Sequence, residues 1–232
     1  MPAALAYVLA VASVQSPSVA TTFAYSETQK KDFYTTKLKL PVFKGSPLAD
    51  FATVQLGKET GTGLAAWMKE NFSGAAAKTK PRLPYFYDVQ PFVSMATPNL
   101  ISVYFTISTF EAGAHPRTVF DPHTFAMIDG KPVEVQAKNL FRPDVKFVPI
   151  VSSLVMSKLM QNDRAEWVQD GTVKALTPDQ VESFVVTPSS ITYLFNPYDM
   201  GPYAVGSFQV KVPFSELASD LDKAGALASV LK

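Results

Sequence analysis

The sequence has no cysteine, only 2 histidines and no long run of one charge. Without cysteine, the chain has no disulfide, no thiolate metal site and no cysteine nucleophile. Its 21 lysine and arginine residues against 20 aspartate and glutamate residues give a formal net charge of +1. Binding to a nucleic-acid backbone requires clustered positive charge, so we expect no nucleic-acid partner. The lack of thiols also suits a protein exported to an oxidising compartment.

Long apolar runs are scarce, and the run near the start, Ala3 to Ala12, is short. Its length is typical of a signal-peptide core, and Ser18 and Ala20 provide small residues for cleavage. A membrane-spanning helix needs about 20 apolar residues. We therefore expect residues 1–20 to be a signal peptide and the mature protein to be soluble, with no membrane span. No lysine or arginine precedes the run, so the alternatives are a hydrophobic first strand or a disordered start.

Alternating apolar and polar residues predict several β-strands. Leu38, Leu40 and Val42, for example, lie on one side of a strand whose other side carries lysines. A Pro-Asn turn after residue 97 and the pair Asp129-Gly130 predict two antiparallel hairpins. The segments with strand patterns are 32–45, 85–95, 100–110, 118–128, 131–135, 184–195 and 203–212.

Helical patterns lie between these strands. Ser46 followed by Pro47 predicts a capped helix start, and glycines at 61 and 63 divide the run to residue 72 into two pieces. Further helices are predicted over 142–161, over 177–184 behind a capping box, and over 213–231 as a closing amphipathic helix.

Hydrophobic residues make up 47% of the 232 residues, which is enough for a sizeable core. Hairpins dominate the pattern, without regular β-α-β alternation. We therefore expect an α+β fold, in which antiparallel hairpin-rich sheets pack with a few helices in two lobes of similar size.

Both histidines lie in EAGAHPRTVFDPHTF, residues 111–125. On one continuous strand, His115 and His123 would share a face but lie about 26 Å apart, at about 3.3 Å per residue. They meet at a metal ion only if the chain turns between them, and their spacing matches no zinc motif such as H-E-x-x-H. We predict no metal site and no cofactor, with one histidine hydrogen-bonded at a sheet edge and the other exposed.

Enzyme chemistry finds little support in the sequence, and we expect a protein that is not an enzyme. A Ser-His-Asp triad would use Ser94 or Ser108, but no G-x-S-x-G turn is present. Glu111 and Asp121 would make a carboxylate pair, but the sequence does not give their separation. The aromatic residues fit a core and cross-strand pairs, and some outward tyrosines suit a recognition surface.

The segment YLFNPYDMGPYAVGSFQVKVPFSEL, residues 193–217, resembles the signature of a bacterial extracytoplasmic domain family. That family includes the C-terminal region of the anti-sigma factor RsiV and the non-catalytic part of the peptidoglycan deacetylase PdaC. The matching residues here are Phe195, Pro197, Tyr198, Pro202, Tyr203, Ala204, Gly206, Pro213 and Leu217. A second set also matches: Gly113, Ala114, His115, Phe120, Asp121, Gly130, Lys131, Leu140 and Phe141. Ala112 departs from the usual glycine.

The resemblance implies a domain division and a location. Residues 28–115 would form an N-terminal α+β lobe of the PdaC companion type, and residues 116–232 a C-terminal RsiV-like lobe. Members of the family act outside the cytoplasm, and the RsiV region binds lysozyme. We therefore expect a periplasmic or secreted binding protein with a lysozyme-like protein or a peptidoglycan fragment as its partner.

The resemblance also suggests where a ligand binds, namely at His115, Asp121, Tyr198 and Tyr203. One alternative is a cell-wall hydrolase or deacetylase-like enzyme that uses His115 and Asp121. Another is a structural module of the cell envelope that holds no small ligand.

Overall fold

The computed structural model describes residues 19–74 and 79–231. The predicted signal peptide, residues 1–20, lies outside this range except for its last residues. Among the helices so described, none combines the length and the apolar character that crossing a bilayer requires.

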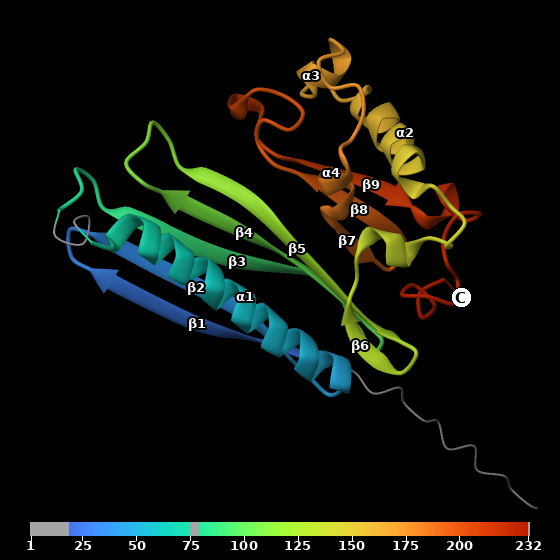
Figure 1. Ribbon diagram of the computed structural model, residues 1–232, viewed down its shortest axis with the longest axis horizontal. Helices are drawn as coiled ribbons and strands as arrows, with labels where there is room; N and C mark the ends of the chain where they lie inside the picture. Colours follow the sequence, from blue (N-terminus) through green and yellow to red (C-terminus); the bar gives the residue numbers. More distant parts are fainter. Residues whose placement is uncertain (1–18, 75–78, 232) are drawn as a thin grey trace, which may run out of the picture.

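The strands form two sheets, which Figure 1 shows side by side. Six strands build a mixed sheet in the order β1-β2-β3-β4-β5-β6, and three build an antiparallel sheet in the order β7-β8-β9. Among the described strands of this sheet, β2 and β3 pair in parallel and the other neighbours pair antiparallel. The strands are β1 (Ala20–Lys30), β2 (Tyr34–Lys44), β3 (Tyr85–Ala96), β4 (Leu100–Phe110), β5 (Arg117–Ile128), β6 (Lys131–Glu134), β7 (Phe184–Thr187), β8 (Ser190–Phe195) and β9 (Phe208–Pro213). This arrangement is the predicted α+β fold, and both predicted hairpins are present.

Helix α1 (Pro47–Phe72) connects β2 to β3 and covers one face of the six-stranded sheet (Figure 1). The predicted cap is confirmed, because Ser46 Oγ accepts a hydrogen bond from the backbone N–H of Ala49 at 3.1 Å. The predicted division at the glycines is wrong, since α1 is continuous. A Cβ on Gly63 would lie 3.0 Å from Tyr87 Oη, so a residue without a side chain lets the helix approach the sheet. Packing against the sheet outweighs the low helix propensity of glycine.

The face of the sheet under α1 holds the first of two hydrophobic cores. Its buried members are Phe43, Leu48, Ala49, Ala52, Leu56, Trp67, Tyr87, Val89, Ile101, Val103, Phe105 and Phe125.

The second core surrounds the three-stranded sheet; it includes residues from the helices of the C-terminal part and, from the large sheet, Leu100 and Ala126. These helices are α2 (Phe147–Leu159), α3 (Glu166–Gln169) and α4 (Pro178–Glu182). The largest fully buried side chains of this core are Tyr193, Phe195, Leu100, Leu140, Leu159 and Ile191.

The closing helix predicted over 213–231 is absent, and the chain there forms a 3-10 turn, Phe214–Glu216, followed by further turns. The backbone of this segment instead forms hydrogen bonds with residues 140 and 142. Asp222 N–H donates to Leu140 C=O at 2.9 Å, and Arg142 N–H donates to Asp220 C=O at 2.9 Å. These bonds require an extended chain and therefore compete with a helix.

The domain boundary predicted between residues 115 and 116 lies in the turn between β4 and β5. These strands pair without interruption from Leu100–Ala126 to Thr109–Arg117.

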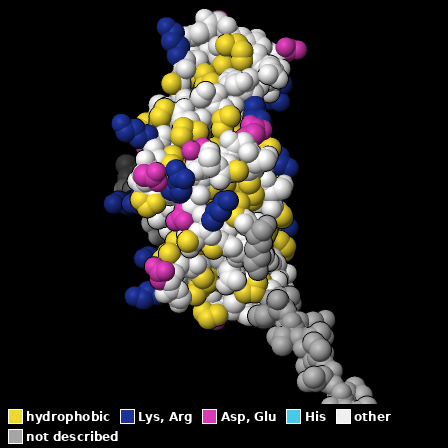
Figure 2. All heavy atoms as spheres, turned by 90° about the vertical axis from the view of Figure 1, so that its right-hand side faces the viewer, with side chains coloured by type: hydrophobic (Ala, Val, Ile, Leu, Met, Phe, Trp, Pro, Cys, Tyr) yellow, Lys and Arg dark blue, Asp and Glu magenta, His cyan; other side chains and the backbone are white. Residues whose placement is uncertain are grey.

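Figure 2 shows the end of the molecule that carries the C-terminus, where acidic and basic side chains are interspersed among hydrophobic ones.

The two sheets are joined by hydroxyl groups at β7, an edge strand of the smaller sheet. The backbone N–H of Val186 donates to Ser102 Oγ at 2.8 Å, and its C=O accepts from Ser94 Oγ at 2.9 Å. Ser102 Oγ also lies 2.7 Å from Thr124 Oγ1, and Ser102 is fully buried. Buried backbone groups without a partner are costly, so these hydroxyls allow the edge of β7 to lie against β3 and β4.

Replacing Ser102 with alanine should therefore weaken the junction between the sheets. The Val186 N–H would lose its acceptor in a buried setting, and we expect a loss of about 1–3 kcal/mol in the free energy of unfolding. Urea denaturation measures this loss. The matched control is Ser108→Ala, in the same strand, because the Ser108 hydroxyl bonds the side chain of Thr118 in the neighbouring strand of the same sheet. Equal losses in both variants would contradict the role given to Ser102.

Candidate functional site

The two histidines belong to separate clusters. His115 is exposed in the turn between β4 and β5, and its ring stacks on Tyr203 with centroids 3.7 Å apart. His123 lies within β5 and is only 8% exposed. Asp121 contacts His123, with its Oδ2 atom 3.3 Å from Nε2. Of the four predicted ligand residues, the structure therefore brings together His115, Tyr198 and Tyr203, whereas Asp121 joins the other histidine.

Four rings form a series that we call the aromatic row: Trp167, Tyr198, Tyr203 and His115. The centroids of Trp167 and Tyr198 are 6.5 Å apart, and those of Tyr198 and Tyr203 are 5.6 Å apart. Tyr198 is 57% exposed, so this position of the row is accessible to solvent. The Tyr203 hydroxyl donates to the C=O of Pro116, which fixes the row to the start of β5.

Hydrogen bonds hold the turn that carries Tyr198 in place. Asn196 Oδ1 accepts from the backbone N–H of Phe120 at 2.7 Å, which ties the turn to β5. Asp199 Oδ2 accepts from Asn196 N–H at 2.6 Å. Burial raises the pKa of Asp199, and the bond from Asn196 opposes this rise. Tyr198 has a φ of 74°, in the left-handed region, which a residue with a side chain adopts only where its surroundings enforce it.

Residues 201–207, which follow the turn that carries Tyr198, pack too closely for a side chain at Gly201. A Cβ on Gly201 would lie 2.8 Å from Val205 Cγ2 and 3.2 Å from the C=O of Arg164. The guanidinium of Arg164 donates to the C=O groups of Val205 and Ser207. Gly206 has a φ of 74° and ends the 3-10 turn that begins at Tyr203. These contacts explain why glycine stands at positions 201 and 206, and they hold the backbone around Tyr203 in place.

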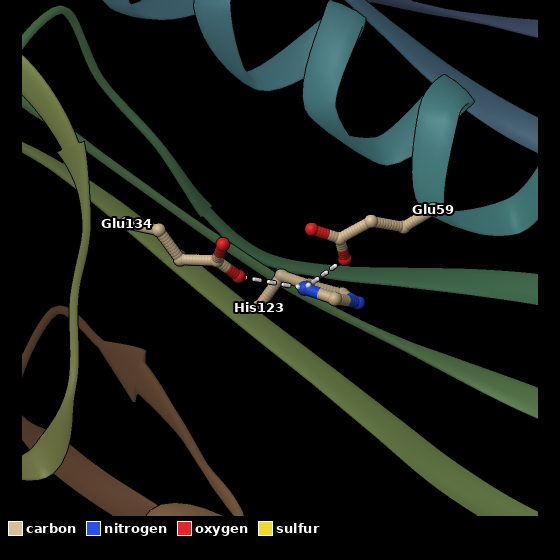
Figure 3. Close-up of side chains that lie close together, drawn as sticks. All are labelled: Glu59, His123 and Glu134. Carbon is tan, nitrogen blue, oxygen red and sulfur yellow. Dashed lines mark hydrogen bonds and ion pairs between the residues drawn. The ribbon is translucent and has the colours of Figure 1, made fainter. Parts of the chain in front are cut away.

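The second cluster consists of Glu59, Asp121, His123 and Glu134, and we call it the His123 cluster. Figure 3 shows three of its members, from α1, β5 and β6. His123 Nδ1 lies 2.9 Å from Glu134 Oε1 and 3.2 Å from Glu59 Oε2. On the other side of the ring, Nε2 is buried without a hydrogen bond and lies 3.3 Å from Asp121 Oδ2.

The sequence analysis did not identify Glu59 or Glu134 as site residues. The position of Glu134 could have been predicted from the Asp129-Gly130 hairpin. The Asp129-Gly130 turn sets the register of β5 and β6, which pairs Glu134 with Phe125. Residues two apart on a strand share a face, so Glu134 had to lie near His123. Glu59 comes from α1, and no short-range pattern connects it with β5.

The carboxylates determine the charge of His123. Burial lowers the pKa of His123, but the carboxylates of Asp121, Glu134 and Glu59 outweigh this effect and raise it to about 10. Burial also raises the pKa of Glu59; the charge of His123 opposes this rise, and the nearby Glu134 and Asp121 carboxylates add to it. At neutral pH, His123 is therefore a buried imidazolium among three acidic groups.

Comparison with known proteins relates the C-terminal part to one family. Residues 138–215 match the family model described as "Protein of unknown function (DUF3298)". Two crystal structures of DUF3298 proteins share the fold. The one from Bacteroides fragilis has a TM-score of 0.63 and 17% identity, covering 94% of this chain and 99% of that chain. The one from Pseudomonas aeruginosa PAO1 has a TM-score of 0.60 and 15% identity, covering 89% of this chain and 95% of that chain.

Sequence comparison also finds distant mycobacterial relatives. Immunogenic protein MPT64 of Mycobacterium tuberculosis and immunogenic protein MPB64 of Mycobacterium bovis are each 26% identical over 160 residues. The aligned part covers 67% of this chain and 69% of each relative. Trp167, Tyr198 and Tyr203 lie inside the segment that matches DUF3298, whereas His115 and the His123 cluster lie outside it.

The charge of His123 can be tested by following its ring resonances by NMR as the pH rises. We expect the imidazolium form to persist through neutral pH, with a titration midpoint well above the ordinary value of about 6.5. Because the folded pKa is raised, the stability that His123 contributes is fully present below about pH 6.5 and is lost as the pH rises through about 10. Glu134→Gln should lower the midpoint, because it removes a carboxylate partner. His115→Gln identifies the signals of the other ring, and a His123 midpoint near 6.5 would contradict the assignment.

Proposed function

We propose that this chain is an extracytoplasmic binding domain that holds a cell-wall glycan on the aromatic row. The observation that carries this proposal is the exposure of Tyr198 within a series of neighbouring aromatic rings. The signal-like start and the resemblance to envelope proteins support the location.

Glycan chemistry fits the row. A pyranose ring has apolar C–H faces and a rim of hydroxyls, and tyrosine and tryptophan likewise combine an apolar ring with a polar group. Sugar faces can therefore stack on the rings while their hydroxyls bond the rim. The strained backbone at Tyr198 and the bond from Tyr203 to Pro116 fix the rings in advance, which reduces the entropy lost on binding.

Binding without turnover suits the arrangement better than hydrolysis. His115 stacks on Tyr203, and Asp121 contacts His123, so we do not propose His115 and Asp121 as a catalytic pair.

A lysozyme-like protein partner is the second candidate, and a different surface favours it. Phe23, Tyr25 and Phe92 are 49%, 60% and 48% exposed on the large sheet. Phe92 also stacks on Tyr104, with centroids 4.9 Å apart. Exposed aromatic surface of this kind is typical of protein interfaces.

Calorimetric titration with N-acetylglucosamine oligomers and with soluble peptidoglycan fragments tests the proposal. We expect saturable binding that Tyr198→Ala weakens at least about tenfold, because the variant removes a central contact. Tyr25→Ala is the matched control, since it removes an equally exposed tyrosine from the edge of the sheet.

Immobilised lysozyme provides the second arm of the experiment. Capture that depends on Tyr25 and Phe92, together with no glycan binding, would replace the first candidate with the second. If neither ligand binds, or if Tyr198→Ala binds glycan normally, the proposed role of the aromatic row is wrong.

A further inference from the structure

The atoms around His123 Nδ1 are spaced like ligands of a metal ion. Nδ1, a Glu59 carboxylate oxygen and a Glu134 carboxylate oxygen all lie within 4.8 Å of one another. The distances from Nδ1 to these oxygens are 3.2 Å and 2.9 Å. Zinc bonds of about 2.0–2.2 Å in tetrahedral geometry place neighbouring ligand atoms about 3.4 Å apart. Small side-chain shifts would therefore admit an ion between the three groups shown in Figure 3.

The charge at this position is unbalanced. Glu59, Asp121 and Glu134 each pair with His123, and within the described ranges none of them forms an ion pair with lysine or arginine. The charge of the neighbouring Lys58 lowers the pKa of Glu59 without forming an ion pair within the described ranges. Three carboxylates thus share one imidazole, so the site favours an additional positive charge.

The far side of the ring provides an independent indication. His123 is 8% exposed, and its buried Nε2 atom has no hydrogen-bond partner although Asp121 Oδ2 is 3.3 Å away. Histidines that bind a metal through one nitrogen usually donate the other N–H to a carboxylate. A metal on Nδ1 would leave the proton on Nε2, directed at Asp121, and a small rotation of the ring would complete that bond.

We infer that the His123 cluster binds a divalent transition-metal ion of the Zn²⁺ class. His123 Nδ1, Glu59 and Glu134 are the ligands, and Asp121 positions the imidazole. Zn²⁺ replaces the proton on Nδ1, and that proton leaves to solvent. One nitrogen and two carboxylates suit zinc better than Ca²⁺, which takes 6–8 oxygen ligands.

The ligands come from α1, β5 and β6, so the ion would connect the helix to the strands beneath it. An ion that binds only the folded chain stabilises the fold in proportion to its concentration. Zinc would therefore act as a cross-link of the first core, at a distance in the chain from the loop that carries Tyr198.

The experiment uses the full chain without a histidine tag, freed of metal with EDTA and dialysed. Calorimetry with ZnCl₂ should give one ion per chain, and thermal unfolding should show a higher midpoint with zinc. His123→Gln and Glu134→Gln should abolish both effects, and Asp121→Asn should weaken binding about 10–100-fold, as expected for a positioning residue. Each variant is compared with its own metal-free midpoint, so a change in intrinsic stability does not enter the result.

Two controls make the outcome specific. His115→Gln removes the other histidine, and Glu166→Gln removes an exposed carboxylate, so both variants should bind zinc like the parent chain. Glu134 is 41% exposed, which allows Glu134→Gln to fold, and near-ultraviolet circular dichroism verifies that it does.

NMR of the histidine rings tests directly whether zinc binds His123. A purely structural role of the His123 cluster would not change the Nδ1 resonance when zinc is added. Zinc should shift the Nδ1 resonance of His123 and leave that of His115 in place. Absence of stoichiometric zinc binding, retention of binding in Glu134→Gln and His123→Gln, or dependence on His115 would overturn the inference. Stronger binding of CaCl₂ than of ZnCl₂ would also overturn it.

Discussion

The hydrogen bonds that the backbone of Val186 forms with the hydroxyls of Ser94 and Ser102 determine how the two sheets meet. An edge strand exposes backbone groups that need partners, and β7 finds them in side chains of the larger sheet rather than in another strand. The smaller sheet can therefore lie against β3, β4 and β5 without extending their sheet. Because β8 leads directly into the loop that begins at Asn196, this junction also sets where the loop meets β5. The bond from Phe120 N–H to Asn196 and the contact of Tyr203 with Pro116 follow from that placement.

Strand β5 contributes to the His123 cluster and also bonds the loop of the aromatic row. Its side chains alternate between the face under α1 and the face toward the smaller sheet. His123 and Phe125 face α1, whereas Thr124 and Ala126 face the smaller sheet through Ser102 and the second core. A shift of one residue in the pairing of β4 and β5 would exchange these environments. The Asp129-Gly130 hairpin fixes the register of β5 against β6, and β5 pairs with β4 continuously from Leu100–Ala126 to Thr109–Arg117.

Local patterns predicted the hairpins, the Ser46 cap and the capping box at Thr177, since each depends on residues close in the chain. They failed where distant contacts decide the structure. Helix α1 continues through its glycines because the sheet supports it, and residues 213–231 form turns because their backbone bonds the segment near Leu140. The same limit applies to the sites. The motif indicated Tyr198, Tyr203 and His115, but Glu59 reaches His123 from a helix whose position only the complete fold determines.

The His123 cluster is difficult to explain as a device for stability alone. Burial of an imidazolium among carboxylates costs solvation energy that the attraction between the charges often does no more than offset, and apolar residues of similar size can stabilise a fold as well. Phe105 and Phe125, on either side of His123, show that the environment accepts such residues. The neighbouring polar atoms are also incompletely matched, because Nε2 has no hydrogen bond while Nδ1 faces two carboxylates. A divalent cation in place of the Nδ1 proton adds positive charge where the two carboxylates meet, and Nε2–H stays directed at Asp121.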